Sequence, residues 1–149
     1  MNEPKQVKNS KKIFSTEDKV DDSFERDLKA ACRSLTYISE TDADVIPFIA
    51  GEPASRELES YLIALGITSK EIEEREFDKF FDRLTAEKDW HGPNEKKRTK
   101  QFSQLRDVLQ KNLDGLRVIR IGKIRLDIYI AGVGAGGRLA GVKTRAIET

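Results

Sequence analysis

The alternation of apolar and polar residues is strongest in residues 117–131. Strict alternation is typical of a β-strand with one buried face, and the central Gly122-Lys123 pair indicates a two-residue hairpin turn. Pairing Ile121 with Ile124 would sort the side chains between two faces. The predicted apolar face holds Ile119, Ile121, Ile124, Leu126, Ile128 and Ile130, and the other holds Val118, Arg120, Arg125, Asp127 and Tyr129. Helices from earlier in the chain are expected to cover the apolar face.

Apolar residues at helical spacing predict helices elsewhere in the chain. The first is expected over residues 22–38, with Ser23 as its N-cap. A second is expected over residues 54–65, with Gly66 as its C-cap. The next segment should be a short strand or extended stretch followed by a helix with Phe77, Phe80, Phe81 and Leu84 on one face. The last helix is expected over 95–114, with Gly115 ending it.

Two further strands complete the prediction. One covers residues 45–50, where Pro47 indicates an edge strand, and the other covers residues 139–147. Polar loops are expected at residues 39–44 and 85–94. The order of helix, strand, helices and then three closely connected strands predicts an α+β fold with a mainly antiparallel sheet packed by helices.

Composition describes one charged domain. The chain has 149 residues, of which 38% are hydrophobic and 36% charged, with a formal net charge of +1. This balance gives no general argument for nucleic acid or a membrane as partner. Without an apolar run long enough for a membrane span or a secretory h-region, a cytoplasmic location is the expectation. The single Cys32 lies on a helical stripe and is predicted to be a buried thiol.

The lysine-rich N-terminal segment should behave differently from the rest. Residues 1–20 carry few apolar side chains, so we expect a disordered basic arm followed by a folded domain over residues 21–149. This arm is either a site for nucleic acid or phosphate surfaces or a solubilising tail, and the second interpretation is the simpler one.

Candidate catalytic and ligand-binding patterns are weak. Residues 132–137 match G-x-G-x-x-G, but a strand rather than a helix follows them, which indicates a hairpin loop. His91 with Asp89 and Glu95 offers too few ligands for zinc. The alternating acids Glu40, Asp42 and Asp44 lack the other features of an EF-hand loop and indicate a solvated turn. We therefore expect neither an enzyme, nor a cofactor, nor a metal site of the protein's own.

The lone tryptophan allows two interpretations. Trp90 lies in a polar loop beside Gly92-Pro93, where it either covers the core or anchors a protein interface. The basic residues from Lys96 to Lys100 are most simply a solvated helix start, because no aromatic residues are interleaved with them.

Several segments together resemble the nuclease A inhibitor family. They are Asp89-Trp90, residues 102–113, residues 118–130 and the terminal Leu139-Ala-Gly-Val-Lys-Thr-Arg-Ala-Ile-Glu-Thr149, and residues 35–40 before Pro47-Phe48 are also similar. The likeness spans residues 24–149 and is weakest over 54–75. Family members are protein inhibitors of a magnesium-dependent, sugar-nonspecific ββα-metal nuclease.

The resemblance implies an α-β-α sandwich that blocks the active site of the nuclease, one to one, as a monomer. It implies that Glu40 enters the catalytic cleft, that Asp89 and Trp90 form a loop contact, and that Thr149 approaches the catalytic magnesium of the partner. The chain departs from the family after Trp90: residues 91–98 are basic where an acidic stretch would mimic phosphates. Two alternatives follow: the same scaffold binding another protein, or nucleic acid bound through the basic arm.

Overall fold

The computed structural model describes the backbone of residues 15–149 and the side chains of residues 23–149. Helix α1 (Ser15–Cys32) begins earlier than predicted, and Ser23 lies inside it rather than at its N-cap. The helix also takes in the last residues of the predicted N-terminal arm, whose residues 1–14 lie outside the described part of the chain. The predicted helix end was wrong as well, because the chain turns after Cys32 and enters a strand at Thr36.

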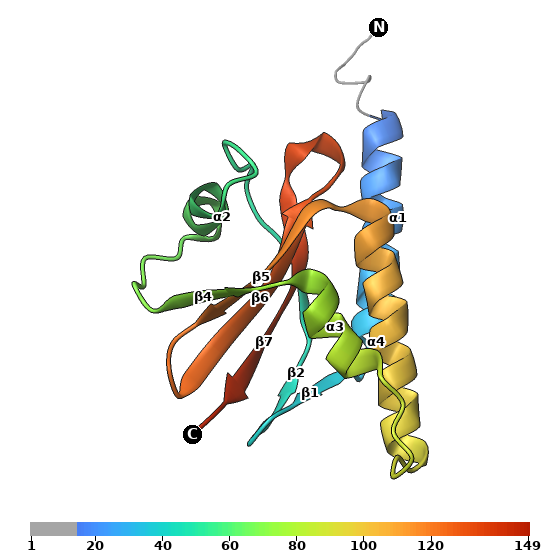
Figure 1. Cartoon of the computed structure of the whole chain (residues 1–149). Helices are drawn as coiled ribbons and strands as arrows, with labels where there is room; N and C mark the ends of the chain where they lie inside the picture. Colours follow the sequence, from blue (N-terminus) through green and yellow to red (C-terminus); the bar gives the residue numbers. More distant parts are fainter. Residues whose placement is uncertain (1–14) are drawn as a thin grey trace, which may run out of the picture.

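In the described part of the chain, five strands form one antiparallel sheet in the order β3-β7-β6-β5-β4. These strands are β3 (Ile46–Ile49), β4 (Ile72–Arg75), β5 (Asp114–Ile121), β6 (Arg125–Val133) and β7 (Leu139–Ile147). Figure 1 shows α2 (Leu58–Leu65) on one face of the sheet, and α1, α3 (Phe77–Thr85) and α4 (Pro93–Asn112) on the other. The prediction of an α+β fold, an α-β-α sandwich with an antiparallel sheet, is confirmed.

The predicted register of the β5–β6 hairpin was wrong. Ile119 pairs with Tyr129 and Arg120 with Ile128, rather than Ile119 with Leu126. As a result, the residues of the predicted apolar face lie on both faces of the sheet. Ile119 and Ile121 point toward α2. Leu126, Ile128 and Ile130 lie with Val118 in the core under the other helices. Ile124 is left in the turn with 55% of its surface exposed. Both faces of this hairpin are covered, so alternation alone did not identify one inner face.

Most other elements agree with their predictions. Strand β7 has the predicted bounds, β4 precedes α3 as expected, and Gly66 caps α2 in the left-handed conformation with φ 71°. Pro47 lies in β3, an edge strand, as predicted. The glycine-rich segment connects antiparallel β6 to β7, which confirms the hairpin interpretation.

Two helices are displaced by a few residues. Helix α2 begins at Leu58, later than predicted. Helix α4 begins at Pro93, where the Glu95 side chain accepts a hydrogen bond from the Gly92 N–H at 3.0 Å, and ends at Asn112. Asp114 and Gly115 therefore belong to strand β5.

The predicted polar loop at residues 39–44 is largely a hairpin. Strands β1 (Thr36–Ile38) and β2 (Asp42–Asp44) pair antiparallel, with Ile38 opposite Asp42. Tyr37 of β1 is buried and stacks on Phe80 of α3, with ring centroids 6.0 Å apart. The β1–β2 hairpin is thereby held against α3, on the face of the sheet that α1, α3 and α4 cover.

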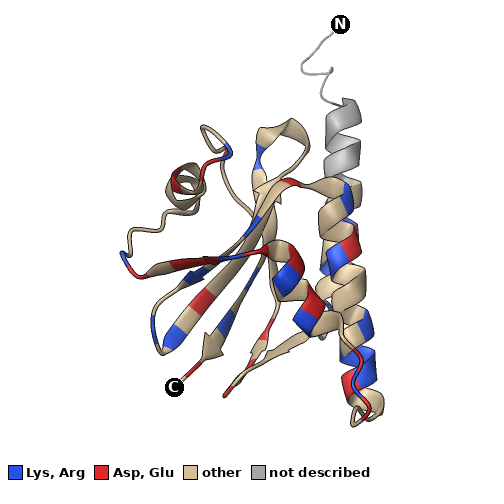
Figure 2. Ribbon diagram, in the orientation of Figure 1, with Lys and Arg blue, Asp and Glu red and all other residues tan. Residues whose placement is uncertain are grey.

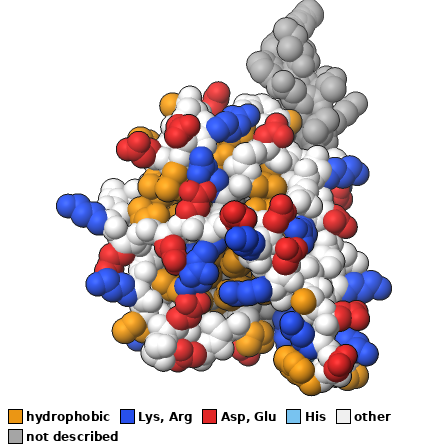
Figure 3. All heavy atoms as spheres, viewed as in Figure 1, with side chains coloured by type: hydrophobic (Ala, Val, Ile, Leu, Met, Phe, Trp, Pro, Cys, Tyr) orange, Lys and Arg blue, Asp and Glu red, His pale blue; other side chains and the backbone are white. Residues whose placement is uncertain are grey.

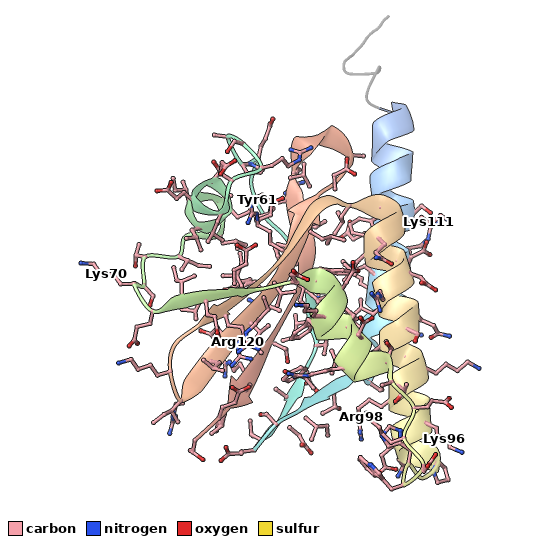
Figure 4. All side chains as sticks on the ribbon, viewed as in Figure 1. Tyr61, Lys70, Lys96, Arg98, Lys111 and Arg120 are labelled. Atoms are coloured by element: carbon pink, nitrogen blue, oxygen red, sulfur yellow. The ribbon has the colours of Figure 1, made fainter. Side chains whose placement is uncertain are left out.

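Two apolar clusters lie on the two faces of the sheet. The larger joins α1, α3 and α4 to the sheet through Leu28, Phe81 and Leu105, and it includes Cys32, whose predicted burial is confirmed. The smaller lies under α2 and centres on Tyr61, which Figure 4 shows between that helix and the sheet. Among the described residues, no helix is long and apolar enough to cross a membrane.

Candidate functional site

Glu40 and Thr149 form one hydrogen-bonded unit at the end of the β1–β2 hairpin. The Glu40 carboxylate accepts hydrogen bonds from the Thr149 main-chain N–H at 2.7 Å and from the Thr149 hydroxyl at 2.9 Å. Both residues are exposed. The sequence placed these residues 109 positions apart, and the fold brings them into direct contact.

The hairpin also holds the outer edge of β7. Ser39 Oγ accepts a hydrogen bond from the Ile147 N–H at 3.0 Å, and the Glu40 N–H donates to the Ile147 carbonyl at 3.2 Å. Further along the same strand, the Thr144 hydroxyl donates to the Asp44 carbonyl at 2.9 Å. These contacts continue where the β3 pairing of β7 stops, at Lys143. We define residues 38–42 with residues 147–149 as the acidic tip.

Hydrogen bonding favours the ionised form of Glu40. The Thr149 main-chain N–H, and then the Thr149 hydroxyl, lower the pKa of the Glu40 carboxyl below its ordinary value. A carboxylate that accepts several hydrogen bonds is stabilised in its charged form. Glu40 therefore carries its negative charge at neutral pH with its oxygens already oriented by Thr149.

The residue before Thr149 is anchored from inside the sheet. The Glu148 carboxylate accepts a short hydrogen bond from Arg120 Nη2, and the Glu148 N–H donates to the Ile124 carbonyl at 2.9 Å. Arg120 is 6% exposed. Figure 4 shows Arg120 over the lower part of the sheet, the part that ends in the C-terminus.

The α3–α4 loop, residues 86–92, carries the other two predicted contact residues. Trp90 is 74% exposed and lies edge-on against His91, with ring centroids 4.4 Å apart. His91 Nδ1 accepts a hydrogen bond from the Lys88 N–H at 3.2 Å, which shapes the loop. Trp90 therefore does not cover the core, and its role as an interface anchor stays a prediction. Asp89 beside it is exposed as well.

The loop and the acidic tip lie at the same end of the molecule. Figure 1 shows the C-terminus and the β1–β2 turn side by side at the lower left of the molecule, and the α3–α4 loop at the lower right, below α4. Hydrophobic side chains reach the surface over the loop in Figure 3. The structure thus brings Glu40 and Thr149 into contact and places the loop with Asp89 and Trp90 at the same end.

Charge at this end is divided between the two sides. Figure 2 shows acidic positions at the β1–β2 turn and the C-terminus, and basic positions along the first turns of α4. Lys96 and Arg98 lie at this lower end of α4 in Figure 4. Any partner of this surface would meet carboxylates from the acidic tip and cations from the start of α4.

The acidic tip presents carboxylate groups at the surface. Within the described residues, no group of three or more His, Cys, Asp and Glu side chains is placed to hold a metal ion. Glu40 is hydrogen-bonded to Thr149, and Asp42 and Asp44 lie on β2. What the acidic tip offers is a set of outward-facing anionic oxygens held by hydrogen bonds.

Sequence reasoning missed three residues of this arrangement. Ser39 was assigned to a polar loop, Arg120 to the face of the hairpin opposite the predicted apolar face, and Glu148 received no role. An arginine in the middle of an alternating strand was the available signal for a buried ion pair. The prediction, however, placed the covering helices over the other face of the hairpin.

The fold and the site define an α-β-α sandwich protein with an exposed acidic tip and a neighbouring tryptophan loop, a surface suited to contact another macromolecule. The family model described as "Nuclease A inhibitor-like protein" matches residues 22–149, and the chain belongs to this family. The resemblance seen in the sequence is thereby confirmed. No individual curated protein matches the chain.

Proposed function

We propose that the protein inhibits a magnesium-dependent, sugar-nonspecific nuclease by occupying its active site with the acidic tip. The observation that supports this most strongly is the direct contact between Glu40 and Thr149, two residues that the family resemblance assigns to the nuclease cleft. The complex contains one inhibitor and one nuclease. The protein itself performs no catalysis.

The carboxylates of Glu40 and Thr149 can take the place of the phosphodiester that the nuclease binds. The active site of such a nuclease presents a hard cation and basic side chains to the phosphate of its substrate. Magnesium prefers oxygen ligands and keeps water-filled positions that a carboxylate can take. The terminal carboxylate of Thr149 is ionised at neutral pH, since its reference pKa is about 3.3–3.7. In this proposal it approaches the nuclease magnesium, and Glu40 supplies the second negative charge.

Order in the free protein favours tight binding. Thr149 is held by Glu40, and β7 is held by the β1–β2 hairpin up to Ile147. Groups that are already ordered lose less conformational entropy on association. Trp90 adds an apolar contact beside the charged cleft, and tryptophan is a frequent interface anchor. Asp89 adds a polar contact from the same loop.

The test is a nuclease assay on DNA with increasing amounts of inhibitor. Removing Thr149, or adding residues after it, should weaken inhibition by at least about a hundredfold, the effect of losing a buried charged contact. Glu40→Gln should weaken inhibition in the same direction. Removing residues 1–14 is the control for chain shortening, and Glu59→Gln on the exposed surface of α2 is the control for loss of one carboxylate.

The outcomes separate the tip from the rest of the surface. Full inhibition by the chain without Thr149 would refute the role of the terminal residue. Equal losses for Glu40→Gln and Glu59→Gln would show that net charge, rather than the acidic tip, governs the effect.

The basic start of α4 supports one alternative. Lys96 and Arg98 lie at the same end as the acidic tip, so the same scaffold would suit a partner protein that carries both signs of charge. Capture of an acidic protein, with no effect on any nuclease, would favour this second function. Binding to nucleic acid through these cations would instead show a steep loss of affinity with salt.

A further inference from the structure

Arg120 is a buried charged side chain beside the apolar core. It lies on the face of the sheet that carries Val118 and Ile128, and it is 6% exposed. A buried guanidinium is costly unless anions and hydrogen bonds compensate it. Among the described side chains, Arg120 Nε is the buried nitrogen that has no hydrogen-bond partner. The burial of Arg120 is therefore compensated by its contacts with neighbouring carboxylates, although one of its N–H donors has no hydrogen-bond partner.

Two carboxylates lie beside Arg120, and they are not equivalent. Glu148 accepts the short hydrogen bond from Arg120 Nη2. Glu73 lies on edge strand β4, 3.5 Å from Arg120 Nε, and accepts a hydrogen bond from Arg75 at 3.0 Å. Arg120 thus makes its directed contact with the segment that leads into the acidic tip, and Glu73 is shared with another arginine.

Glu148 is the junction between the sheet and the tip. The β6–β7 ladder ends with Ile147 opposite Arg125. Beyond it, the Glu148 main chain has its hydrogen bond to Ile124, and Thr149 has those to Glu40. The Arg120 side chain joins this junction to the middle of the sheet, so the terminal segment is held from below by Arg120 and from the side by Glu40.

We propose that Arg120 is the positioning residue of the acidic tip: through Glu148 it fixes the terminal segment so that Thr149 meets Glu40 in the orientation that enters the partner. The proposal deepens the proposed function and rests on it for the inhibition measurement, but the positioning itself is measurable in the free protein. Arg120 touches no partner group in this scheme, because it is buried beneath Glu148.

The chemistry of the site permits a clean perturbation. Arg120→Met removes the buried charge, keeps an apolar chain of similar length, and leaves the Glu148 carboxylate without its partner, a loss that is costly only where the remaining charge is cut off from water. Glu148 retains 42% exposure of its side chain, so water can solvate its carboxylate when Arg120 is absent. The variant should therefore fold, with the terminal segment released.

The experiment measures the free protein and the inhibition together. In Arg120→Met, NMR titration should show the pKa of Glu40 moving up toward the ordinary value of about 4.3, because the Thr149 donors no longer stay in place. The Thr149 amide should exchange faster with solvent. Inhibition of the nuclease should fall on the order of tenfold, the expected cost of ordering the released residues on binding. Arg120→Lys keeps the charge, so each of these quantities should change less than in Arg120→Met.

Glu73→Gln is the matched control, because it removes the other carboxylate beside Arg120 and leaves the Arg120–Glu148 contact. It should leave the pKa of Glu40 and the inhibition unchanged. If Arg120→Met does not fold, Glu148→Gln tests the same contact from the exposed side.

The results distinguish the two levels of the argument. A folded Arg120→Met with an unchanged low pKa at Glu40 overturns the positioning role. A raised pKa with undiminished inhibition also overturns it, since the order of the tip would then have no part in binding. If the wild-type protein inhibits no nuclease, the proposed function fails, and the pKa and amide exchange alone decide whether Arg120 positions Thr149.

Discussion

Gly141 is the position in the β6–β7 pair at which one added methyl group should have the largest effect. It lies opposite Ala131 in the ladder, with φ 157°. A Cβ atom built there would lie 1.8 Å from the Ile130 carbonyl oxygen and 2.9 Å from the Ile130 carbonyl carbon. A weak but acceptable carbon–oxygen contact is roughly 3.3–3.6 Å, so the two central strands would have to separate locally.

The expected cost follows from that separation. About two ladder hydrogen bonds would be lost or stretched, at about 0.5–1.5 kcal/mol each, and the backbone conformation would add about 1–3 kcal/mol of strain. The smaller entropy of the unfolded alanine chain offsets about 0.4–1 kcal/mol. Gly141→Ala should therefore lower the free energy of unfolding by about 1–5.5 kcal/mol, a substantial part of the roughly 5–15 kcal/mol typical of a domain.

Urea unfolding followed by far-UV circular dichroism measures this difference. Fluorescence would be a poor probe, because Trp90 is 74% exposed in the folded protein. Gly51→Ala is the matched control, since a Cβ atom at Gly51 meets no other atom within 4 Å. If the two variants differed by less than about 0.5 kcal/mol, the error of summing independent effects, the close approach of β6 and β7 at Gly141 would be refuted.

Three further predictions address titration, a single hydrogen bond and charge. Burial raises the pKa of the Cys32 thiol to about 12, so the folded protein keeps a proton that the unfolded chain loses above about pH 8.5. Stability should be complete below that pH and fall as the pH rises toward 12, with a smaller fall in Cys32→Ala by urea unfolding. Tyr61→Phe removes the 2.5 Å hydrogen bond to the Gly115 carbonyl and should cost about 1 kcal/mol in the same assay; an unchanged midpoint would count against that bond. Replacing Lys96, Lys97 and Lys100 by glutamate should speed association with a basic nuclease at low salt, and the gain should shrink as salt screens it. Slower association would favour an acidic partner instead.

Sequence patterns correctly predicted the elements that depend mainly on neighbouring residues in the sequence. Strand β7 followed from its apolar run between a glycine-rich loop and the end of the sequence, and the C-cap at Gly66 followed from its tolerance of positive φ. The β1–β2 hairpin was missed because Asp42 and Asp44 are poor strand formers. That strand pair is held by tertiary contacts, among them the stacking of Tyr37 on Phe80.

The register of β5 and β6 shows why periodicity was not sufficient. Val118 and Ile119 are neighbours in sequence and both fully buried, one under α4 and its neighbours and the other under α2. A strand that is buried on both sides has no polar face to set its register. Arg120 was placed on the face that no helix was predicted to cover, although it is buried and contacts Glu148.

The candidate site depended on information that no local pattern holds. Glu40 and Thr149 are in contact although 109 positions separate them, and only the family resemblance identified them as a pair before the structure. Trp90 was identified as unusual because it is the only tryptophan of the chain. Its exposure excludes the core-cover interpretation.

The acidic tip consequently reports on the folding of the whole domain. Glu40 and Thr149 are 109 residues apart in the sequence, and we expect their contact to form only after β7 has paired with β6 and the β1–β2 hairpin has packed against the edge of β7. Contacts between such distant residues are late and slow to form, since a long loop must be closed first. If the acidic tip binds a nuclease as proposed, a partly folded molecule should not inhibit that nuclease, and inhibition should be gained only when the sheet is complete.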